Sequence, residues 1–497
     1  MRLLCTIKVL ASLVLLCSNL TLASGQTDEP ESLKPIIESI QQKINTGEAA
    51  SISIGVAKAG KPFYVASFGW ADKEQQKEAS STTIYPLGSL SKSITATGLM
   101  HLVQQGKVGL EDEANAYLPK PGLQSFVGDP SEVKVWHILN MAAGIPHGWI
   151  TQEVALGYPT TANEKETYLE KIGLITLPPG KVSHYSNYSY GIAEMLIEKA
   201  SGQLIDDFME EALFDPLGMD QSLTQYDAKR ATDIASLYDT NGEEIAPYHF
   251  IPFGGAGYYG SVEDLLKYGN FHLQLANSKF PKVLDGKHLD LMHNFDEGPM
   301  PFFGFGWLNT GHSLISNGNI TGANSNITLI PSEDMVIVCL INSSSYSSLA
   351  DQLTDQIMNA LLPNLEKKMD MAYFMKHFQT PYQPKQGLIG EWEGAVELET
   401  GSTPVHMNFK ANGEIDFQIA KQATVSLSNV TLLPSGKFEG MGRGRIGVPE
   451  FSMDSSVPIA IALQWEGDQL YGHLAPRFST TEGGRCYGAF VAFSKKK

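Results

Sequence analysis

The chain has 497 residues, of which 42 % are hydrophobic, and a formal net charge of −18. Its apolar content allows a sizeable core, and its length fits one large domain followed by a small one. The acidic balance, with a basic run only at residues 495–497, disfavours nucleic acid and anionic membranes as partners.

Residues 1–25 have the pattern of a secretory signal. Arg2 and Lys8 precede an apolar run over 9–16, and small residues at 23–25 offer a cleavage site. The run is too short to span a bilayer, and no later apolar stretch reaches the required length of about 20 residues. We therefore expect export to the periplasm or the exterior, and no stable membrane span once the signal is removed.

Signal removal leaves two cysteines, Cys339 in an apolar run and Cys486 near the C-terminus. The segments around them belong to different predicted domains. This favours two buried or free thiols, although a disulfide between them stays open.

The next elements in the chain indicate a mixed domain. A helix is predicted over 30–47, where isoleucines recur at helical spacing, and strands over 51–58 and 62–69 are joined by a turn at Gly60. A second helix follows over 90–103, with its apolar residues on or near one buried side. This order favours a mixed α/β domain and not an alternating parallel sheet.

The start of the second helix carries the first candidate chemistry, in the motif Ser89-Leu90-Ser91-Lys92. Positions i and i+3 are neighbours on a helix, so the Lys92 amine lies beside the Ser89 hydroxyl. A lysine whose pKa is lowered by burial can take the serine proton, and N–H groups of the first turn can stabilise an oxyanion. Because Ser-x-x-Lys also starts at Ser131 and Ser494, the motif alone more often marks an ordinary surface pair.

A second candidate group follows a short helix predicted over 134–140. Tyr185 and Asn187 precede a helix over 190–200, and from an extended segment they would point the same way. A phenol beside a lysine can share proton transfer, and an Asn amide can bind a substrate amide or ester. Because Tyr-x-Asn recurs at Tyr268, a helix-capping Asn is the simpler interpretation of this motif by itself.

The glycine-rich segment 253–260 lacks the Lys-Ser/Thr ending of a phosphate loop, so we expect close backbone packing there. Three predicted strands and a helix follow, over 314–319, 326–330, 335–341 and 346–362. The first strand contains Ser316-Asn317-Gly318-Asn319, where Gly318 would let a ligand approach the backbone, although an ordinary turn also fits.

The C-terminal part has a different period. A linker with two prolines is predicted over 369–386, and from residue 388 apolar and polar residues alternate as in half-buried strands. Further strands are expected over 458–465, 470–474 and 486–493. We predict a small all-β domain over 387–497, as a barrel or curled sheet.

Taken in order, the Ser89–Lys92 motif, Tyr185-Ser186-Asn187 and the Gly318 strand resemble the serine β-lactamase and penicillin-binding protein superfamily, whose signatures include Ser-x-x-Lys. The similarity covers residues 35–362. It is greatest to class C β-lactamase-like hydrolases, a group that includes esterases, D-aminopeptidases and D-alanyl-D-alanine carboxypeptidases.

The resemblance implies an α+β (mixed α/β) fold over 26–368, with an antiparallel sheet flanked by helices and an all-helical lobe. The C-terminal part resembles the lipocalin-like β-domains often appended to such enzymes.

The resemblance also implies a role for each motif residue. Ser89 would be the acylated nucleophile, Lys92 its base, and Tyr185 the acid and base for the leaving group and the deacylating water. The substrate would be held by Asn187, Ser316, Gly318 and Asn319, with the backbone N–H groups of Ser89 and Asn319 forming an oxyanion hole. No metal or organic cofactor is implied.

Two positions depart from the family pattern. The third motif usually begins with Lys or His, and the neutral Ser316 in its place weakens the case for a true β-lactamase or carboxypeptidase. Residues 140–144 replace a His-Thr-Ser-Gly type sequence, which changes no proposed catalytic group.

We predict a serine hydrolase that acts on an ester, amide or D-amino-acid peptide, through an acyl-Ser89 intermediate. The alternative is a weak or inactive relative that binds peptide or cell-wall fragments, which Ser316 favours and the four intact motif residues disfavour. The sequence has neither a Gly-x-Ser-x-Gly elbow nor a His-Glu-x-x-His motif, which argues against an α/β-hydrolase and a zinc hydrolase. The oligomeric state is left open.

Overall fold

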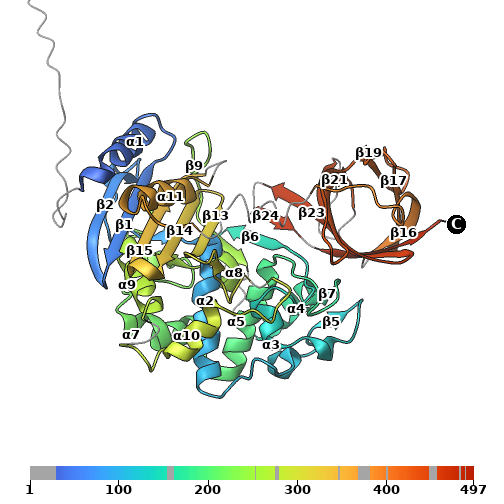
Figure 1. Ribbon diagram of the computed structural model, residues 1–497, viewed down its shortest axis with the longest axis horizontal. Coiled ribbons are helices and arrows are strands. Elements are labelled where there is room, and N and C mark those ends of the chain that lie inside the picture. The colour runs from blue at the N-terminus through green and yellow to red at the C-terminus, as the bar shows by residue number, and fades with distance from the viewer. Residues whose placement is uncertain are drawn as a thin grey trace, which may run out of the picture.

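The computed structural model describes residues 30–153, 162–251, 253–274, 279–300, 302–344, 348–367, 381–398, 401–446, 456–480, 483–486 and 488–496. The predicted signal and residues 369–380 of the predicted linker lie outside these ranges. Within them, a sheet with helices on both faces adjoins a helical lobe, and a barrel stands beside it (Figure 1).

The main sheet is antiparallel and joins the two ends of the first predicted domain. Its seven strands, counted over the described ranges, run in the order β12 (Leu308–Asn309), β13 (Leu314–Ile320), β14 (Ala323–Ile330), β15 (Met335–Ile341), β1 (Ser51–Lys58), β2 (Lys61–Asp72) and β3 (Lys77–Glu78). The β1–β2 pair is the predicted hairpin, and β13, β14 and β15 are the predicted later strands. Because β1 also pairs with β15, strands from the beginning and the end of the first predicted domain lie side by side in one sheet.

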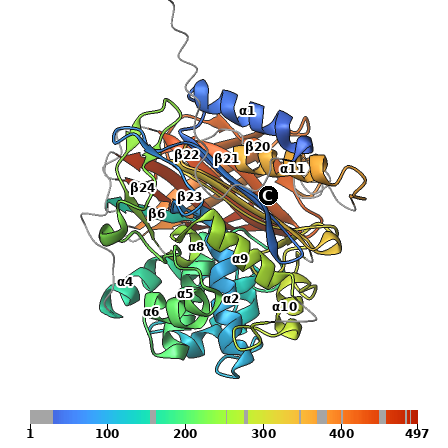
Figure 2. The ribbon, with the colours of Figure 1, turned by 90° about the vertical axis from the view of Figure 1, so that its left-hand side faces the viewer.

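Helices cover both faces of this sheet. α1 (Lys34–Asn45) and α11 (Leu349–Leu361) cover the face away from the lobe, as Figure 2 shows, and pack on alternate residues of β1 and β15 such as Ile54 and Cys339. Cys339 is a buried free thiol, as predicted, while the side chain of Cys486 lies outside the described part of the chain.

The opposite face of the sheet carries α9 (Val262–His272). Gly55 of β1 makes the approach of this helix possible, since a Cβ there would lie 2.5 Å from Val262 Cγ1. Ser261 caps the helix by accepting from the Asp264 amide.

The helical lobe is built around α2 (Ser91–Gln104). The other helices of the lobe are α3 (Val135–Leu139), α4 (Ala162–Ile172), α5 (Asn187–Ser201), α6 (Ile205–Met209), α7 (Asp215–Leu217), α8 (Phe253–Ala256) and α10 (Gly286–His293), with a π-helical turn over Glu210–Phe214.

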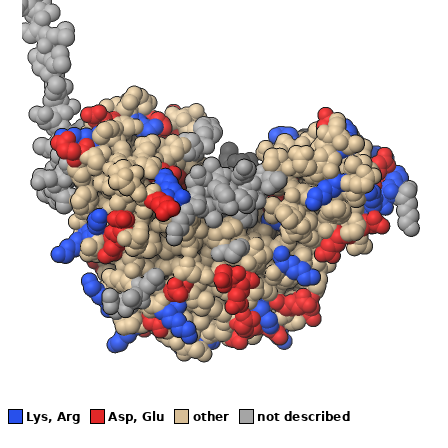
Figure 3. Space-filling view, viewed as in Figure 1, with Lys and Arg blue, Asp and Glu red and all other residues tan. Residues whose placement is uncertain are grey.

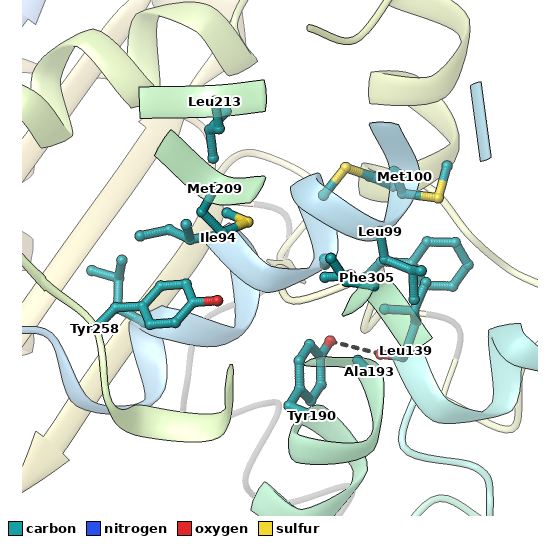
Figure 4. Close-up of a cluster of buried hydrophobic side chains, with 14 of the residues drawn as sticks. Ile94, Leu99, Met100, Leu139, Tyr190, Ala193, Met209, Leu213, Tyr258 and Phe305 are labelled. Atoms are coloured by element: carbon teal, nitrogen blue, oxygen red, sulfur yellow. Dashed lines mark hydrogen bonds between the residues drawn. The ribbon is translucent and has the colours of Figure 1, made fainter. Parts of the chain in front are cut away.

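The prediction of one buried side for α2 is wrong. Its residues are buried all round from Ser91 to Met100, because α5, α8 and α10 pack against different sides of it. Figure 4 shows Ile94 and Met100 of α2 among side chains from other helices, including Tyr190 of α5 and Met209 of α6. A helix enclosed in this way is held rigidly, which suits a scaffold for a site.

Short elements complete this part of the chain. Strand pairs are formed by β4 (Tyr85–Pro86) with β11 (Tyr259–Gly260), β5 (Gln124–Ser125) with β7 (Leu174–Ile175), and β8 (Leu237–Tyr238) with β9 (Glu244–Ile245). Single 3₁₀ turns lie at Glu31–Leu33, Gly88–Leu90, Ala114–Tyr117, Pro130–Glu132, Ala228–Arg230 and Pro331–Glu333.

The C-terminal region forms a nearly closed barrel, as the alternating pattern predicts. Over the residues described there, its nine strands are β16 (Gly390–Leu398), β17 (Gly401–Phe409), β18 (Ile415–Ile419), β19 (Val425–Ser426), β20 (Ser428–Leu432), β21 (Lys437–Gly444), β22 (Val457–Glu466), β23 (Gln469–Thr480) and β25 (Ala489–Lys495). Trp392, Phe409 and Phe417 fill its interior. Tyr382, inside the predicted linker, also packs into this core.

One sheet continues from the barrel into the first predicted domain. The single strand predicted over 486–493 is two strands, β24 (Gly483–Cys486) and β25. β24 pairs with β6 (Trp149–Glu153), and β6 pairs with β10 (Tyr248–Ile251). The barrel is therefore joined to the helical lobe by backbone hydrogen bonds, which the sequence did not indicate.

The surface agrees with the acidic composition. Acidic and basic side chains are interspersed over the face in Figure 3, and its described residues form no broad basic patch. None of the helices in the described ranges has the length and apolar character needed to cross a bilayer.

Candidate active site

Ser89 lies in the 3₁₀ turn Gly88–Leu90 that runs directly into α2. Gly88 enters this turn with φ +54°, a conformation that favours glycine. Ser91 Oγ donates to Gly88 O at 2.6 Å and accepts from the Tyr258 amide at 3.0 Å. These bonds fix the backbone on both sides of Ser89, whose own side chain stays partly exposed.

Lys92 lies one turn further along α2 and is buried. Its Nζ is 3.1 Å from Ser89 Oγ, 2.6 Å from Asn187 Oδ1 and 2.5 Å from Gly255 O. Burial lowers the pKa of Lys92 well below its ordinary value. A neutral amine has two N–H groups for the two carbonyl oxygens, and its lone pair then faces the Ser89 hydroxyl.

Tyr185 completes the contacts of the serine. Its hydroxyl donates to Ser89 Oγ at 2.6 Å. The residue is 43 % exposed, and desolvation of its hydroxyl raises the pKa of Tyr185 to about 12. The phenol therefore stays protonated where the lysine is neutral, and environments that separate two pKa values in this way suit a base and an acid.

The segment before α5 brings Tyr185 and Asn187 to the same place. Ser186 caps α5, accepting from the Ser189 amide at 3.1 Å and donating to Pro146 O at 2.7 Å. Asn187 is the first residue of this helix, which therefore begins earlier than the predicted residue 190. Both side chains reach the Ser89–Lys92 pair, because Ser186 between them is extended (φ −143°, ψ 120°) and its two neighbours point the same way, as predicted.

Strand β13 passes directly beside Ser89. A Cβ at Gly318 would lie 2.0 Å from Leu87 O and 2.7 Å from Ser89 N, so only glycine fits this crossing. A Cβ at Gly88 would lie 3.4 Å from Asn319 N. The amides of Ser89 and Asn319 thus belong to two backbones in close contact.

The other predicted residues of β13 divide between its two faces. Ser316 is buried on the same face as Gly318, as the alternating burial of the strand shows. The Asn319 side chain lies on the other face, where its Oδ1 accepts from Asn324 at 3.0 Å. Asn319 can therefore contribute to the site through its backbone alone.

The sequence analysis missed one contributor, the carbonyl of Gly255 in α8. The close packing predicted for segment 253–260 is present, since a Cβ at Gly255 would lie 2.7 Å from Asn187 O. Glu194 of α5 holds this turn by accepting from the Gly254 amide at 3.0 Å. The glycine run was the available signal, but it gives no indication of which side chain the carbonyl contacts.

A separate cavity lies away from Ser89. This cavity, of about 670 Å³, lies between the end of the main sheet and the end of α11, lined by His312 and Leu362 among others, and it does not include Ser89. Within the described ranges, no cluster of three or more His, Cys, Asp or Glu residues could hold a metal ion.

Comparison with known proteins identifies the family to which this fold and this serine group belong. The chain is a member of the Beta-lactamase family, whose family model matches residues 36–362. The predicted superfamily and fold class are thereby confirmed, while the lipocalin-like character of the barrel stays a prediction.

Individual relatives are distant. Protein flp of Staphylococcus aureus (strain N315) is 25 % identical over 340 residues, which cover 67 % of this chain and 67 % of that protein. Penicillin-binding protein 4* of Bacillus subtilis (strain 168) is 31 % identical over 170 residues, 33 % of this chain and 36 % of that protein.

Two solved structures share the fold. An octameric penicillin-binding protein homologue from Pyrococcus abyssi matches 92 % of this chain and 99 % of its own, with a TM-score of 0.57 and 20 % identity. A class C β-lactamase matches 68 % of this chain and 98 % of its own, with a TM-score of 0.56 and 19 % identity.

Proposed function

We propose that this protein is a serine hydrolase that cleaves an ester, amide or D-amino-acid peptide bond through an acyl-Ser89 intermediate. The observation that carries the proposal is the placement of Ser89 Oγ between two groups. The Tyr185 hydroxyl lies 2.6 Å away and the Lys92 amine 3.1 Å away. Membership of a family composed mostly of serine hydrolases supports the same chemistry.

The proposed acylation follows from these positions. Neutral Lys92 takes the Ser89 proton as Oγ bonds to the substrate carbonyl carbon, and the carbonyl electron pair moves onto its oxygen. The Ser89 and Asn319 amides are the candidate donors to that oxyanion. When the oxyanion collapses, the leaving group departs with the Tyr185 proton, which the Lys92 ammonium replaces.

Deacylation uses the same groups in reverse. A water molecule gives a proton to the Lys92–Tyr185 pair and bonds to the acyl carbon, and the ester bond to Ser89 breaks as its oxygen is reprotonated.

Substrate recognition rests on neutral groups. The Asn187 oxygen is used by Lys92, which leaves its amide N–H groups for a carbonyl of the substrate. Ser316 offers a hydroxyl and no charge, which favours acyl groups without a carboxylate. The N-terminal signal pattern supports action outside the cytoplasm, in the periplasm or the surroundings.

A test of the proposal is hydrolysis of a small activated ester such as a p-nitrophenyl acyl ester. The wild-type protein should turn it over, and Ser89→Ala should lower kcat by roughly 10³-fold or more, as loss of a nucleophile does in other serine enzymes. Retained activity in this variant would refute the nucleophile. If the wild type bound cell-wall peptides but hydrolysed none of several esters and peptides, the alternative of a binding protein would replace the proposal.

A further inference from the structure

Two charged residues, Lys437 and Glu439, lie on the outer surface of the barrel, and Lys437 is nevertheless enclosed. Along β21, Phe438 points into the barrel core, so Lys437 and Glu439 on either side of it point outward. An outward-facing lysine is normally exposed, but Lys437 is only 6 % exposed. The helical lobe covers it.

The partners of these two side chains immediately precede Tyr185. Lys437 Nζ donates to Ser183 O at 2.6 Å and lies 2.7 Å from Glu439 Oε1. His184 Nδ1 donates to the same carboxylate at 3.2 Å. The barrel thus holds the backbone of one residue and the side chain of the next, directly before the tyrosine.

The strand register shows that this contact is part of a continuous face. Glu439 pairs with Ala462, Ala462 with His473, and His473 with Phe490, which places these residues in one row across four strands. His473 Nδ1 is 2.9 Å from Thr176 Oγ1, and its ring packs edge-on against His184 at 4.8 Å. Phe490 stacks on Phe126 at 4.5 Å.

The barrel also supports the segment on the far side of Tyr185. Gly488 packs so tightly on Pro146 that a Cβ there would lie 2.3 Å from the proline ring. Pro146 O is the acceptor for Ser186, the cap of α5. Residues before and after the tyrosine are therefore both braced, directly or through one intermediate, by the same barrel face.

The charges of this contact are matched. Burial alone would raise the pKa of Glu439, but Lys437 and His184 outweigh it and lower that pKa well below its ordinary value. The carboxylate therefore stays ionised beside the ammonium. An enclosed ammonium without this partner would be left with one carbonyl, so the pair depends on both members.

We propose that the barrel is a positioning element of the active site. Lys437 and Glu439 hold residues 183 and 184 so that the Tyr185 hydroxyl stays within 2.6 Å of Ser89 Oγ. This inference rests on the proposed function, because it assigns the barrel a role in the same reaction. Neither residue touches the reacting atoms, and each acts through the tyrosine.

The test uses Lys437→Met in the full-length protein, with the p-nitrophenyl ester as substrate. Because a displacement of about 1 Å can cost on the order of 100-fold, kcat should fall by roughly 10- to 100-fold while KM stays within about twofold. Lys437→Arg, which can still reach Ser183 O, should restore most of kcat. Lys410→Met is the matched control, since it removes an exposed barrel ion pair with Asp416 and should leave kcat unchanged.

A double mutant separates positioning from a general loss of structure. In a Tyr185→Phe background, Lys437→Met should lower kcat by less than about twofold, because the group that it positions is already absent. The same large loss in both backgrounds, or no loss in either, would overturn the inference. If Lys437→Met does not fold, Glu439→Gln provides the same comparison.

Failure of the inference and failure of the proposed function give different results. An active Ser89→Ala variant would overturn both. An inactive Ser89→Ala variant together with an unimpaired Lys437→Met variant would overturn the positioning role alone.

Discussion

The helical lobe and the barrel bury different kinds of side chain. The lobe encloses a polar helix, since the buried residues of α2 include Ser91, Lys92, Ser93, Thr95 and Thr97. The barrel interior is apolar. Among the described residues of the barrel, the buried polar side chains are those of Lys437, Gln464 and His473, and all three lie on its outer face. In the barrel, the burial of Lys437 and His473 marks the contact with the lobe. In the lobe, the buried polar side chains include Lys92 of the candidate site itself.

The polar helix is possible because its hydroxyl groups find nearby carbonyl acceptors. Ser93 donates to Leu90 O, and Thr97 donates to Ser93 O, within the helix. Thr95 donates to Gly254 O, next to the carbonyl that receives the Lys92 amine. Buried polar groups are tolerated when bonded in this way, and here the bonds also fix the backbone around Ser89.

The largest expected difference in kcat is between a Gly→Ala substitution beside Ser89 and one in the barrel. Gly318→Ala would place a methyl group 2.0 Å from Leu87 O and so displace the turn that carries Ser89. We expect kcat for the p-nitrophenyl ester to fall by about 100-fold, as for other misplacements of this size. Gly440→Ala in β21 meets nothing closer than 3.6 Å and should leave kcat within about twofold. Equal effects of the two variants would contradict the close crossing at Ser89.

The dependence of kcat/KM on pH sharpens the comparison, because the lobe has titratable groups at the proposed reacting centre. Lys92 must be neutral, and its lowered pKa means that activity rises with pH and levels off well below pH 10.5. Tyr185 must be protonated, and its pKa of about 12 keeps the plateau level past pH 10. Below the plateau the rate should fall about tenfold per pH unit.

The neighbouring His147 does not disturb this profile. Its ring lies 5.3 Å from that of Tyr185, and burial lowers the pKa of His147 to about 3, so it stays neutral over the range. The rates are measured against Ser89→Ala at each pH to remove alkaline hydrolysis of the ester. A rate that climbed without a plateau to pH 10.5 would contradict the lowered pKa of Lys92.

The smallest expected effect is a change of substrate preference. Ser316→Lys adds a cation on the face of β13 that meets Ser89, and we expect a several-fold gain in kcat/KM for carboxylate-bearing esters relative to neutral ones. Asn317→Lys is the matched control, because Asn317 bonds to Asp351 on the other face of the strand. An equal change in both variants would refute a role for Ser316 in substrate choice.

Local patterns predicted much of this fold. The glycines, the helical spacing of isoleucines and the alternation after residue 388 indicated α1, the β1–β2 hairpin and the barrel strands. The pairing of β1 with β15 was not predictable, because nearly 300 residues separate the partners and the pairing leaves no local signal. The full enclosure of α2 was missed for a similar reason, since its hydroxyl groups resemble surface residues until their acceptors are known.

The contacts of the candidate site also divide into those that local sequence predicted and those that it did not. Ser89 and Lys92 are one helical turn apart, so their contact was predictable from spacing alone. The position of Tyr185 beside this pair was inferred from the resemblance to the family. The Gly255 carbonyl and the Lys437–Glu439 contact left no pattern, since any residue has a carbonyl and charged residues two apart are usual on the outside of a strand.

The central claim is that Ser89 is acylated, and intact-mass analysis tests it most directly. The wild-type protein and Ser89→Ala are exposed in parallel to a penicillin, a D-alanyl peptide and a simple activated ester. The account predicts that at least one probe adds a single acyl mass to the wild type, on the peptide that contains Ser89, and that Ser89→Ala gains none. An adduct that persists in Ser89→Ala, or the absence of any adduct with all three probes, would contradict it.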